Sequence, residues 1–352
     1  MSEIKNILIK NYRGIKNLTI NDLNKINIFV GPNNSGKTSI LEAIGLSIPL
    51  IEENLSTFID SLGTRYHRFT PDTFISMFPI DNEDNNAITI MSEFYNNLKI
   101  NLSVKYEKDM NIDENGESFR NLKCNYNYNI KENGKVSEQL VTVILSEERK
   151  GLAIRHRVDK NSELKIIYNY VSFSRMDRNE KLLDYIDKLL ENNQRKELIG
   201  ALKIFDESIE NFEVVGKSRI VKIFSTKHKK PLTIYDYGNG TYKVFFIITA
   251  ALLSKNGILL IDEVEAGIHI KALAKVVDKL LKICELNNVQ LFMTTHSLET
   301  VDSILYNYDE NDSLGNNIVT YHLKKNDESS KAIRYSANKL KELRENLGFD
   351  IR

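Results

Sequence analysis

Residues 26–46 have the sequence INIFVGPNNSGKTSILEAIGL, and this stretch decides the fold. The run Ile26–Val30 is apolar and stops at Gly31, which is typical of a buried strand followed by a turn. From Lys37 onward the apolar residues recur at the spacing of a helix, until Pro49 ends the pattern. The segment therefore predicts a strand, a glycine-rich loop and a helix, in that order.

The loop between this strand and this helix matches the pattern G-x-x-x-x-G-K-[ST] in full. Its glycines let backbone N–H groups converge on a phosphate, and the loop opens onto the positive end of a helix dipole. Lys37 can reach the β- and γ-phosphates of a nucleotide, so we count it as catalytic, and the Thr38 hydroxyl can bind Mg²⁺. We therefore expect ATP and Mg²⁺ as ligands, bound by Gly31, Pro32, Asn33, Asn34, Ser35, Gly36, Lys37, Thr38 and Ser39.

Two acids follow a second apolar run, because Ile258–Ile261 leads directly into Asp262 and Glu263. Side chains alternate along a strand, so adjacent acids at its tip face different ways. We expect Asp262 to hold Mg²⁺ through its water shell and Glu263 to act as the general base for an attacking water. The alternative is a strand that ends in two solvated acids without a chemical role.

A polar cluster follows the next apolar run, where Val289–Met293 leads into Thr294, Thr295, His296 and Ser297. The carboxyl end of a buried parallel strand is where ligands bind in an α/β sheet. His296 is therefore a candidate catalytic residue that hydrogen-bonds the γ-phosphate. The alternative is a histidine at the start of a helix that Ser297 or Thr295 caps.

The remaining periodicities predict an α/β fold in a single domain, 1–352, with a mixed central sheet. Apolar and polar residues alternate in residues 7–20, which predicts a hairpin. They also alternate in Ile88–Met91, Lys99–Tyr106, Leu122–Ile130 and Leu140–Leu145, which predicts an antiparallel β side sheet within residues 50–165. Apolar residues at helical spacing predict a short helical insertion at 175–215. The segment 231–352 returns to alternating strands and helices and carries the acids and the histidine described above.

Composition excludes several classes of protein. Lys and Arg number 48, as do Asp and Glu, so the formal net charge is zero and a nucleic-acid binder that works by bulk charge is disfavoured. Two distant cysteines, Cys124 and Cys284, form no disulfide framework and favour a reducing, cytoplasmic compartment. The longest apolar runs fall short of the ~18 residues that span a bilayer, so we expect no membrane association.

These motifs, in their order, resemble the ABC-type ATPase heads of the SMC, RecF and OLD group, and most of all the OLD-like predicted AAA ATPases of prokaryotes. The resemblance also includes the opening residues 9–15 and the segments 231–240, 262–269, 294–297 and 350–352. OLD nucleases carry a TOPRIM-type nuclease domain after the ATPase. We expect none here, because the chain ends soon after His296.

The resemblance implies that two heads sandwich ATP, with a signature loop of one copy closing the site of the other. The matching residues are Asp236, Gly238 and Gly240, and a serine is usual where this chain has Asp236. A carboxylate there repels a γ-phosphate unless a cation intervenes. The alternative for this segment is a simple helix-capping turn. The resemblance also places Arg13 against the nucleotide and the loop of Glu265 and His269 against the partner head, and Arg65 is a weaker candidate for an arginine finger.

The function that we expect is an ATP-hydrolysing switch that self-assembles as a dimer or larger ring. It would control a separately encoded effector, such as a nuclease in a prokaryotic defence system, and this role rests on the resemblance. One alternative is a DNA-repair ATPase of the RecF or SMC kind that acts directly on DNA, to which the basic cluster at 217–230 would contribute. Another is a scaffold that binds nucleotide without hydrolysing it.

Overall fold

The computed structural model describes residues 3–51, 54–55, 57–59, 70–79, 87–112, 118–148, 151–160, 164–172, 179–204, 206–308, 313–325 and 330–351. The chain forms two compact units. The first contains residues 1–24, 31–168 and 321–334, and the second contains residues 25–30, 169–320 and 335–352. Arg65 lies outside the described residues.

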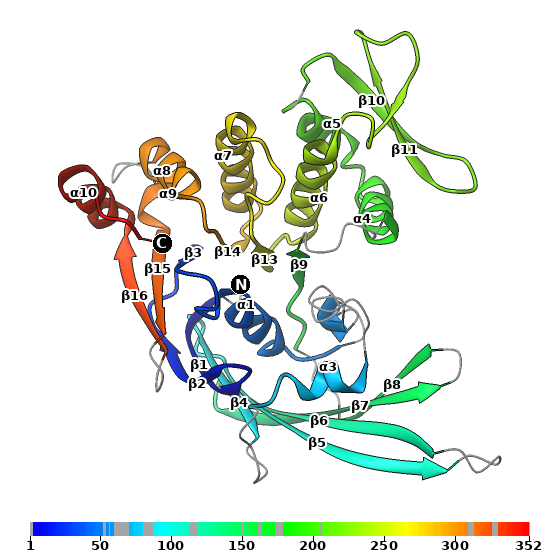
Figure 1. Ribbon diagram of the computed structural model, residues 1–352, viewed down its shortest axis with the longest axis vertical. Helices are drawn as coiled ribbons and strands as arrows, with labels where there is room; N and C mark the ends of the chain where they lie inside the picture. Colours follow the sequence, from blue (N-terminus) through cyan, green and yellow to red (C-terminus); the bar gives the residue numbers. More distant parts are fainter. Residues whose placement is uncertain are drawn as a thin grey trace. The chain divides into compact units, whose positions relative to one another are not determined.

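The first unit is built on a seven-stranded antiparallel sheet with the order β2-β1-β4-β5-β6-β7-β8 (Figure 1). Its strands are β1 (Ile4–Tyr12), β2 (Ile15–Ile20), β4 (Ile88–Phe94), β5 (Lys99–Ile112), β6 (Ser118–Glu132), β7 (Lys135–Glu148) and β8 (Gly151–Lys160). The predicted hairpin is confirmed, since Ile9 pairs with Leu18 across β1 and β2. Burial alternates along β4, with Ile88 and Ile90 buried and Met91 exposed, so one face of the sheet forms the core.

Two helices of the first unit are α1 (Lys37–Leu46) and α3 (Pro71–Ile75), and the inner face of the sheet also holds the chain that leaves α1. The Tyr128 hydroxyl donates to the Leu46 carbonyl at 3.2 Å, and the Gln139 amide donates to the Leu50 carbonyl at 3.1 Å. Buried polar groups on this face are thus used to satisfy backbone carbonyls at the end of a helix. These bonds fix α1, and with it the loop at its start.

The second unit is α/β. Its elements are β3 (Ile26–Val30), β9 (Tyr168–Ser172), α4 (Asn179–Glu191), α5 (Arg195–Leu202), β10 (Ile209–Val215), β11 (Ile220–Ser225), β12 (Leu232–Thr233), α6 (Asn239–Leu253), β13 (Ile258–Asp262), α7 (Ile270–Leu286), β14 (Gln290–Thr294), α8 (Leu298–Asn307), α9 (Ser313–Asn316) and α10 (Ala337–Leu347), while β15 (Ile318–Lys325) and β16 (Ser330–Ser336) belong in part to each unit. Helices α6, α7 and α8 lie side by side in Figure 1.

A six-stranded sheet has the order β16-β15-β3-β14-β13-β9. Strand β14 pairs in parallel with β3 on one side and with β13 on the other. All five residues of each of these three strands are buried, as expected for parallel strands that are covered on both faces. The predicted α/β class, with a mixed sheet and an antiparallel side sheet, is confirmed.

The structure corrects several element predictions. Strands β8 and β16 have no counterpart in the sequence-based expectation, because their charged residues hide the alternation. The segment 175–215 contains the helices α4 and α5, but it ends in strand β10, which pairs with β11 and not with another helix. The domain boundaries drawn from the sequence stay predictions.

No helix among the residues that the structure describes is both long and apolar enough to cross a bilayer.

Candidate functional site

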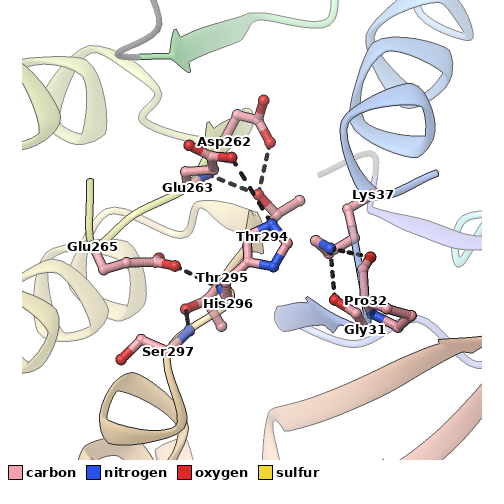
Figure 2. A network of polar contacts seen from close by, with 10 residues as sticks. All are labelled: Gly31, Pro32, Lys37, Asp262, Glu263, Glu265, Thr294, Thr295, His296 and Ser297. Atoms are coloured by element: carbon pink, nitrogen blue, oxygen red, sulfur yellow. Dashed lines mark hydrogen bonds and ion pairs between the residues drawn. The ribbon is translucent and has the colours of Figure 1, made fainter. Parts of the chain in front are cut away.

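The glycine-rich loop starts at the residue after β3 and ends at α1. Gly31 and Gly36 have φ angles of 147° and 96°, in the region that favours glycine. The Lys37 ammonium donates to the carbonyls of Gly31 and Pro32 at 2.7 and 2.9 Å, so the side chain folds back over the loop (Figure 2). Gly36 is the N-cap of α1, so the loop leads directly into the positive end of the helix dipole.

Close packing holds the loop from behind. A Cβ atom at Gly31 would lie 2.8 Å from the Leu323 carbonyl oxygen and 3.0 Å from the Ser35 hydroxyl oxygen, so only glycine fits. The Ser35 hydroxyl is buried and has no hydrogen-bond partner among the described residues. An unpaired hydroxyl inside a cradle of this kind fits a phosphate oxygen. Asn33 and Asn34 are exposed at the tip, while Ser39 is buried and Thr38 half-buried in the first turn of α1.

Arg13 joins the end of β1 to α1, and its expected place against a nucleotide stays a prediction. Its guanidinium forms an ion pair with Glu42 of α1 at 2.7 Å, and the two side chains are only 6% and 0% exposed. The Tyr12 hydroxyl donates to the same carboxylate at 3.1 Å. Arg13 thus anchors α1 to β1, and these contacts position the helix behind the loop.

The two acids at the end of β13 face different ways, as the sequence predicts. Asp262 is buried, and its carboxylate accepts a hydrogen bond from the Thr294 hydroxyl at 2.7 Å. The backbone N–H of Glu263 donates to the same hydroxyl at 2.8 Å. Glu263 has a φ of 52° and an exposed side chain, so the backbone turns sharply to present this carboxylate to solvent. Figure 2 shows Thr294 between the two acids.

His296 joins this group through its ring and its backbone. Its Nε2 lies 3.9 Å from Glu263 Oε1, and its backbone N–H donates to Glu265 at 2.6 Å. Ser297 is the N-cap of α8 and accepts from the Thr300 N–H at 3.1 Å, so the capping role belongs to Ser297. The His296 ring is thereby left beside the exposed carboxylate. That Glu265 holds the His296 backbone was not foreseen, since two residues 31 apart in sequence give no local signal.

The segment around Asp236 forms a closed turn before α6. The Asp236 carboxylate accepts from the Thr233 N–H at 2.9 Å and from the Thr233 hydroxyl at 2.8 Å. These bonds, the backbone one first, lower the pKa of Asp236. Gly238 is the N-cap of α6 with a φ of 97°, and no atom lies within 4 Å of where its Cβ would be. Gly238 therefore stays open to a ligand, while Gly240 is half-buried in the first turn of α6.

Asp262, Glu263 and His296 thus gather in the second unit, and the loop residues from Gly31 to Ser39 gather in the first. Among the described residues no group of three or more His, Cys, Asp or Glu side chains is arranged to hold a metal ion. The Thr38 hydroxyl and the Asp262 carboxylate are hard oxygen donors. Each is, within its own unit, an oxygen ligand of the kind that Mg²⁺ takes, since this ion binds one or two protein ligands and keeps waters and phosphate oxygens for the rest.

Lys243 lies in the second turn of α6 and belongs to none of the predicted motifs. It is 7% exposed, and its ammonium donates to the Ala266 carbonyl at 2.7 Å, in the loop that follows Glu263. Lys243 directly precedes the apolar run Val244–Leu253. A lysine beside such a run indicates a specific polar contact, because a buried ammonium needs a partner.

Comparison with known proteins gives consistent results. A family model described as "AAA domain, putative AbiEii toxin, Type IV TA system" matches residues 26–302. An ATP/GTP phosphatase from Helicobacter pylori is 25% identical over 331 residues, which are 85% of this chain and 86% of that protein. An uncharacterized protein from Methanocaldococcus jannaschii is 35% identical over 115 residues, 33% of this chain and 98% of that protein.

Among solved structures, an SMC head bound to the C-terminal winged-helix domain of ScpA has a TM-score of 0.52 and 12% identity, covering 96% of this chain and 99% of that one. At this level of identity the likeness concerns the fold alone. The chain therefore has the fold of an SMC-type ATPase head.

Proposed function

The chain belongs to the AAA-domain family whose description reads putative AbiEii toxin of a type IV toxin–antitoxin system, and from this premise we propose that it is an ATP-hydrolysing molecular switch. The name of its relative from Helicobacter pylori, ATP/GTP phosphatase, supports the same chemistry. The switch binds ATP with Mg²⁺, closes with a second copy and reopens after hydrolysis.

One observation carries the proposal. Strands β3, β14 and β13 are consecutive neighbours in one sheet, and both pairings are parallel. Strand β3 leads into Gly31, and strands β14 and β13 end at Thr294 and Asp262. Each of the three motifs that the sequence predicts thus begins at the carboxyl end of one of these strands. The carboxyl ends of adjacent parallel strands are where α/β sheets bind ligands. A chance arrangement would not set a glycine-rich loop, a carboxylate pair and a histidine on neighbouring strands.

The residues divide the chemistry among them. The Lys37 ammonium moves from the carbonyls of Gly31 and Pro32 to the β- and γ-phosphates. The N–H groups at the start of α1 and the Ser35 hydroxyl donate hydrogen bonds to phosphate oxygens. Thr38 and Asp262 would hold Mg²⁺, which would neutralise charge on the phosphates. Glu263 takes the proton of the attacking water. His296, beside Glu263, contacts the γ-phosphate or its departing form.

Assembly completes the site. Asp236, Gly238 and Gly240 form an open helix N-terminus, and a second copy of this chain is the source of such a surface for the nucleotide. Glu265 and His269 lie in the loop that faces the partner in this arrangement. The Asp236 carboxylate is already bonded to Thr233, so Gly238 and the α6 N-terminus make the contact. A dimer is the smallest such assembly, and a larger ring is compatible with it.

The output of the switch is control of a separately encoded effector, such as a nuclease in a prokaryotic defence system of the OLD-like kind. This step rests on the resemblance and on the toxin–antitoxin wording of the family description. We propose a cytoplasmic location, in keeping with the two buried, unpaired cysteines Cys124 and Cys284.

A second candidate, direct action on DNA, is favoured by one surface. Among the side chains whose burial the structure describes, strand register and burial assign seven cations and three carboxylates to the outer face of the seven-stranded sheet. The cations are Lys10, Lys99, Lys105, Lys123, Lys131, Arg155 and Arg157, and the carboxylates are Glu93, Glu107 and Glu138. Ion pairs partly neutralise this face, since Lys99 and Lys123 pair with Glu93 and Glu107. They also partly neutralise the basic segment 217–230, where Arg219 and Lys227 pair with Asp187 and Asp206.

Two assays on the purified protein test these functions. Phosphate release from ATP, measured with Mg²⁺ and with excess chelator, should require the metal and should be lost in Lys37→Ala. Absence of any release above that of the variant would reject the ATPase. Fluorescence anisotropy with a labelled DNA duplex over a range of salt then separates the candidates: affinity that falls steeply with salt favours the DNA-acting one.

A further inference from the structure

Helix α6 contains a lysine in surroundings that are otherwise apolar. All ten residues from Thr241 to Ala250 are buried, and Lys243 is among them. Burial lowers the pKa of Lys243, while the nearby Glu263 carboxylate acts in the opposite direction. Keeping an ammonium in such a place costs free energy, so its contacts deserve a functional explanation.

The contact that Lys243 makes is specific. Its ammonium donates to the Ala266 carbonyl at 2.7 Å. The neighbouring Gly267 has a φ of 67°, and a Cβ atom there would lie 2.3 Å from the ammonium nitrogen and 3.1 Å from the Cε carbon of Lys243. Helix and loop are therefore complementary at this point: the glycine leaves the space that the lysine fills.

The loop that Lys243 holds begins with the proposed general base. Glu263 sits in the left-handed region with a φ of 52°. The turn is closed by backbone bonds from Ala266 N–H to the Glu263 carbonyl at 2.8 Å and from Ile268 N–H to the Glu265 carbonyl at 3.0 Å. Strain of this kind persists only where the surroundings impose it. The Thr294 hydroxyl fixes the start of the turn, and Lys243 fixes its end.

We propose that Lys243 is a positioning residue, whose ammonium ties the loop Glu263–Ile268 to helix α6 and so fixes the Glu263 carboxylate for hydrolysis. Helix α6 begins at Gly238, in the turn that we propose as the surface for a second copy's nucleotide. Lys243 thus gives that turn a direct mechanical link to Glu263, within one unit of the chain. The inference rests on the proposed ATPase function, and it adds the residue that connects assembly to the base.

Three variants separate the ammonium contact from other effects. Lys243→Met keeps an unbranched side chain, one atom shorter, and removes the charge and the bond. Gly267→Ala keeps Lys243 but fills the space that it occupies. Gly216→Ala is the matched control, because Gly216 has a similar φ of 75° and no atom within 4 Å of its Cβ position. It reproduces the backbone strain without displacing a lysine.

Hydrogen exchange tests the contact without any need for activity. In Lys243→Met and in Gly267→Ala we expect the amides of Ala266 and Ile268 to exchange about tenfold faster, and in Gly216→Ala at the wild-type rate. Wild-type protection in both of the first two variants would overturn the proposal. Because this readout is independent of turnover, a wild-type protein without ATPase activity would reject the proposed function and would be told apart from a failure here.

Kinetics then test positioning against mere loss of structure. We expect Lys243→Met to lower kcat about tenfold or more while the Kd for ATP changes less than about twofold, because the phosphate loop is untouched. Lys243→Arg, which keeps a cation, should recover part of kcat. Equal losses in kcat and ATP affinity, together with a lowered Tm, would assign Lys243 to folding alone and contradict the proposal, as would a wild-type kcat in Lys243→Met.

Discussion

The starts of helices α1 and α6 are built alike and packed differently. Each has a glycine N-cap, Gly36 with a φ of 96° and Gly238 with a φ of 97°, and neither cap makes a side-chain bond. Each also has a buried lysine on backbone carbonyls, Lys37 on its own loop and Lys243 on the loop after β13. Around the first start, however, Gly31 is packed against Leu323, whereas the position of a Cβ at Gly238 is open.

This difference indicates which of the two helix starts can bind a phosphate without residues from a second copy. A helix N-terminus attracts phosphate through its N–H groups and dipole in both cases. In the proposed function, the loop before α1 binds a nucleotide with residues of its own chain, and the turn before α6 receives a nucleotide that another copy carries. Four substitutions test this difference between the two helix starts.

Lys37→Ala should have the largest effect, because the loss of ATP binding also removes turnover. It removes the charge-assisted bonds to the β- and γ-phosphates, and we expect the affinity for ATP to fall about 100-fold or more. Isothermal titration calorimetry measures it. The matched control is Lys16→Ala, an exposed lysine on β2, which should bind ATP like the wild type. Tight ATP binding by Lys37→Ala would show that the loop before α1 is not the nucleotide site.

Glu263→Gln should lower turnover by about 10²–10⁴-fold while ATP binding persists, because the amide keeps the shape and loses the base. Phosphate release under single-turnover conditions measures the loss. Glu210→Gln, at an exposed position of β10, serves as the control. Unchanged turnover in Glu263→Gln would move the base elsewhere, and His296 would be the next candidate.

Arg13→Met tests whether the anchor behind α1 is structural. Removing one partner of the buried pair leaves Glu42 without its ion pair, and we expect a loss of about 3–5 kcal/mol in the free energy of unfolding. Urea denaturation measures it, and the double variant with Glu42→Met should recover much of the loss. If Arg13→Met weakens ATP binding but leaves the stability unchanged, Arg13 contacts the nucleotide, as the sequence resemblance first implied.

Asp236→Ser should have the smallest effect. A serine still accepts from Thr233 but removes a negative charge beside Gly238, so ATP-dependent self-association should strengthen severalfold. Light scattering with ATP and Mg²⁺ compares the variant with the wild type, and Asp236→Asn separates the charge from the turn. Weaker association in Asp236→Ser would mean that the carboxylate is itself a ligand.

The sequence was informative where local chemistry decides the structure. The loop before α1 and the pair Asp262 and Glu263 were predicted, because a motif of adjacent residues and the alternation of a strand are both local. It was less informative where partners lie far apart along the chain. The pairing of Arg13 with Glu42 and that of Glu265 with His296 depend on topology, which no local pattern contains.

The side sheet shows the same limit on a larger scale. Strands were expected in this region, but β8 was not, since Arg155, His156 and Arg157 interrupt its apolar alternation. The backbone hydrogen bonds to β7 hold β8 in the sheet, and the side chains of β8 do not indicate this pairing. Lys243 is the reverse case: the sequence displays a lysine within an apolar helix, yet its partner, the Ala266 carbonyl, is visible only in the structure.

The central claim, that the start of α6 completes the site of another copy, is tested most directly by mixing two defective variants. Lys37→Ala lacks the lysine of the phosphate loop. Gly240→Glu places a carboxylate at the N-terminus of α6, where the helix dipole stabilises the negative charge and the same charge repels a phosphate. Each alone should be nearly inactive. An equimolar mixture should recover roughly a quarter of wild-type activity, since random pairing puts one intact site in half of the dimers. A mixture no more active than its components, at any protein concentration, would contradict the shared site.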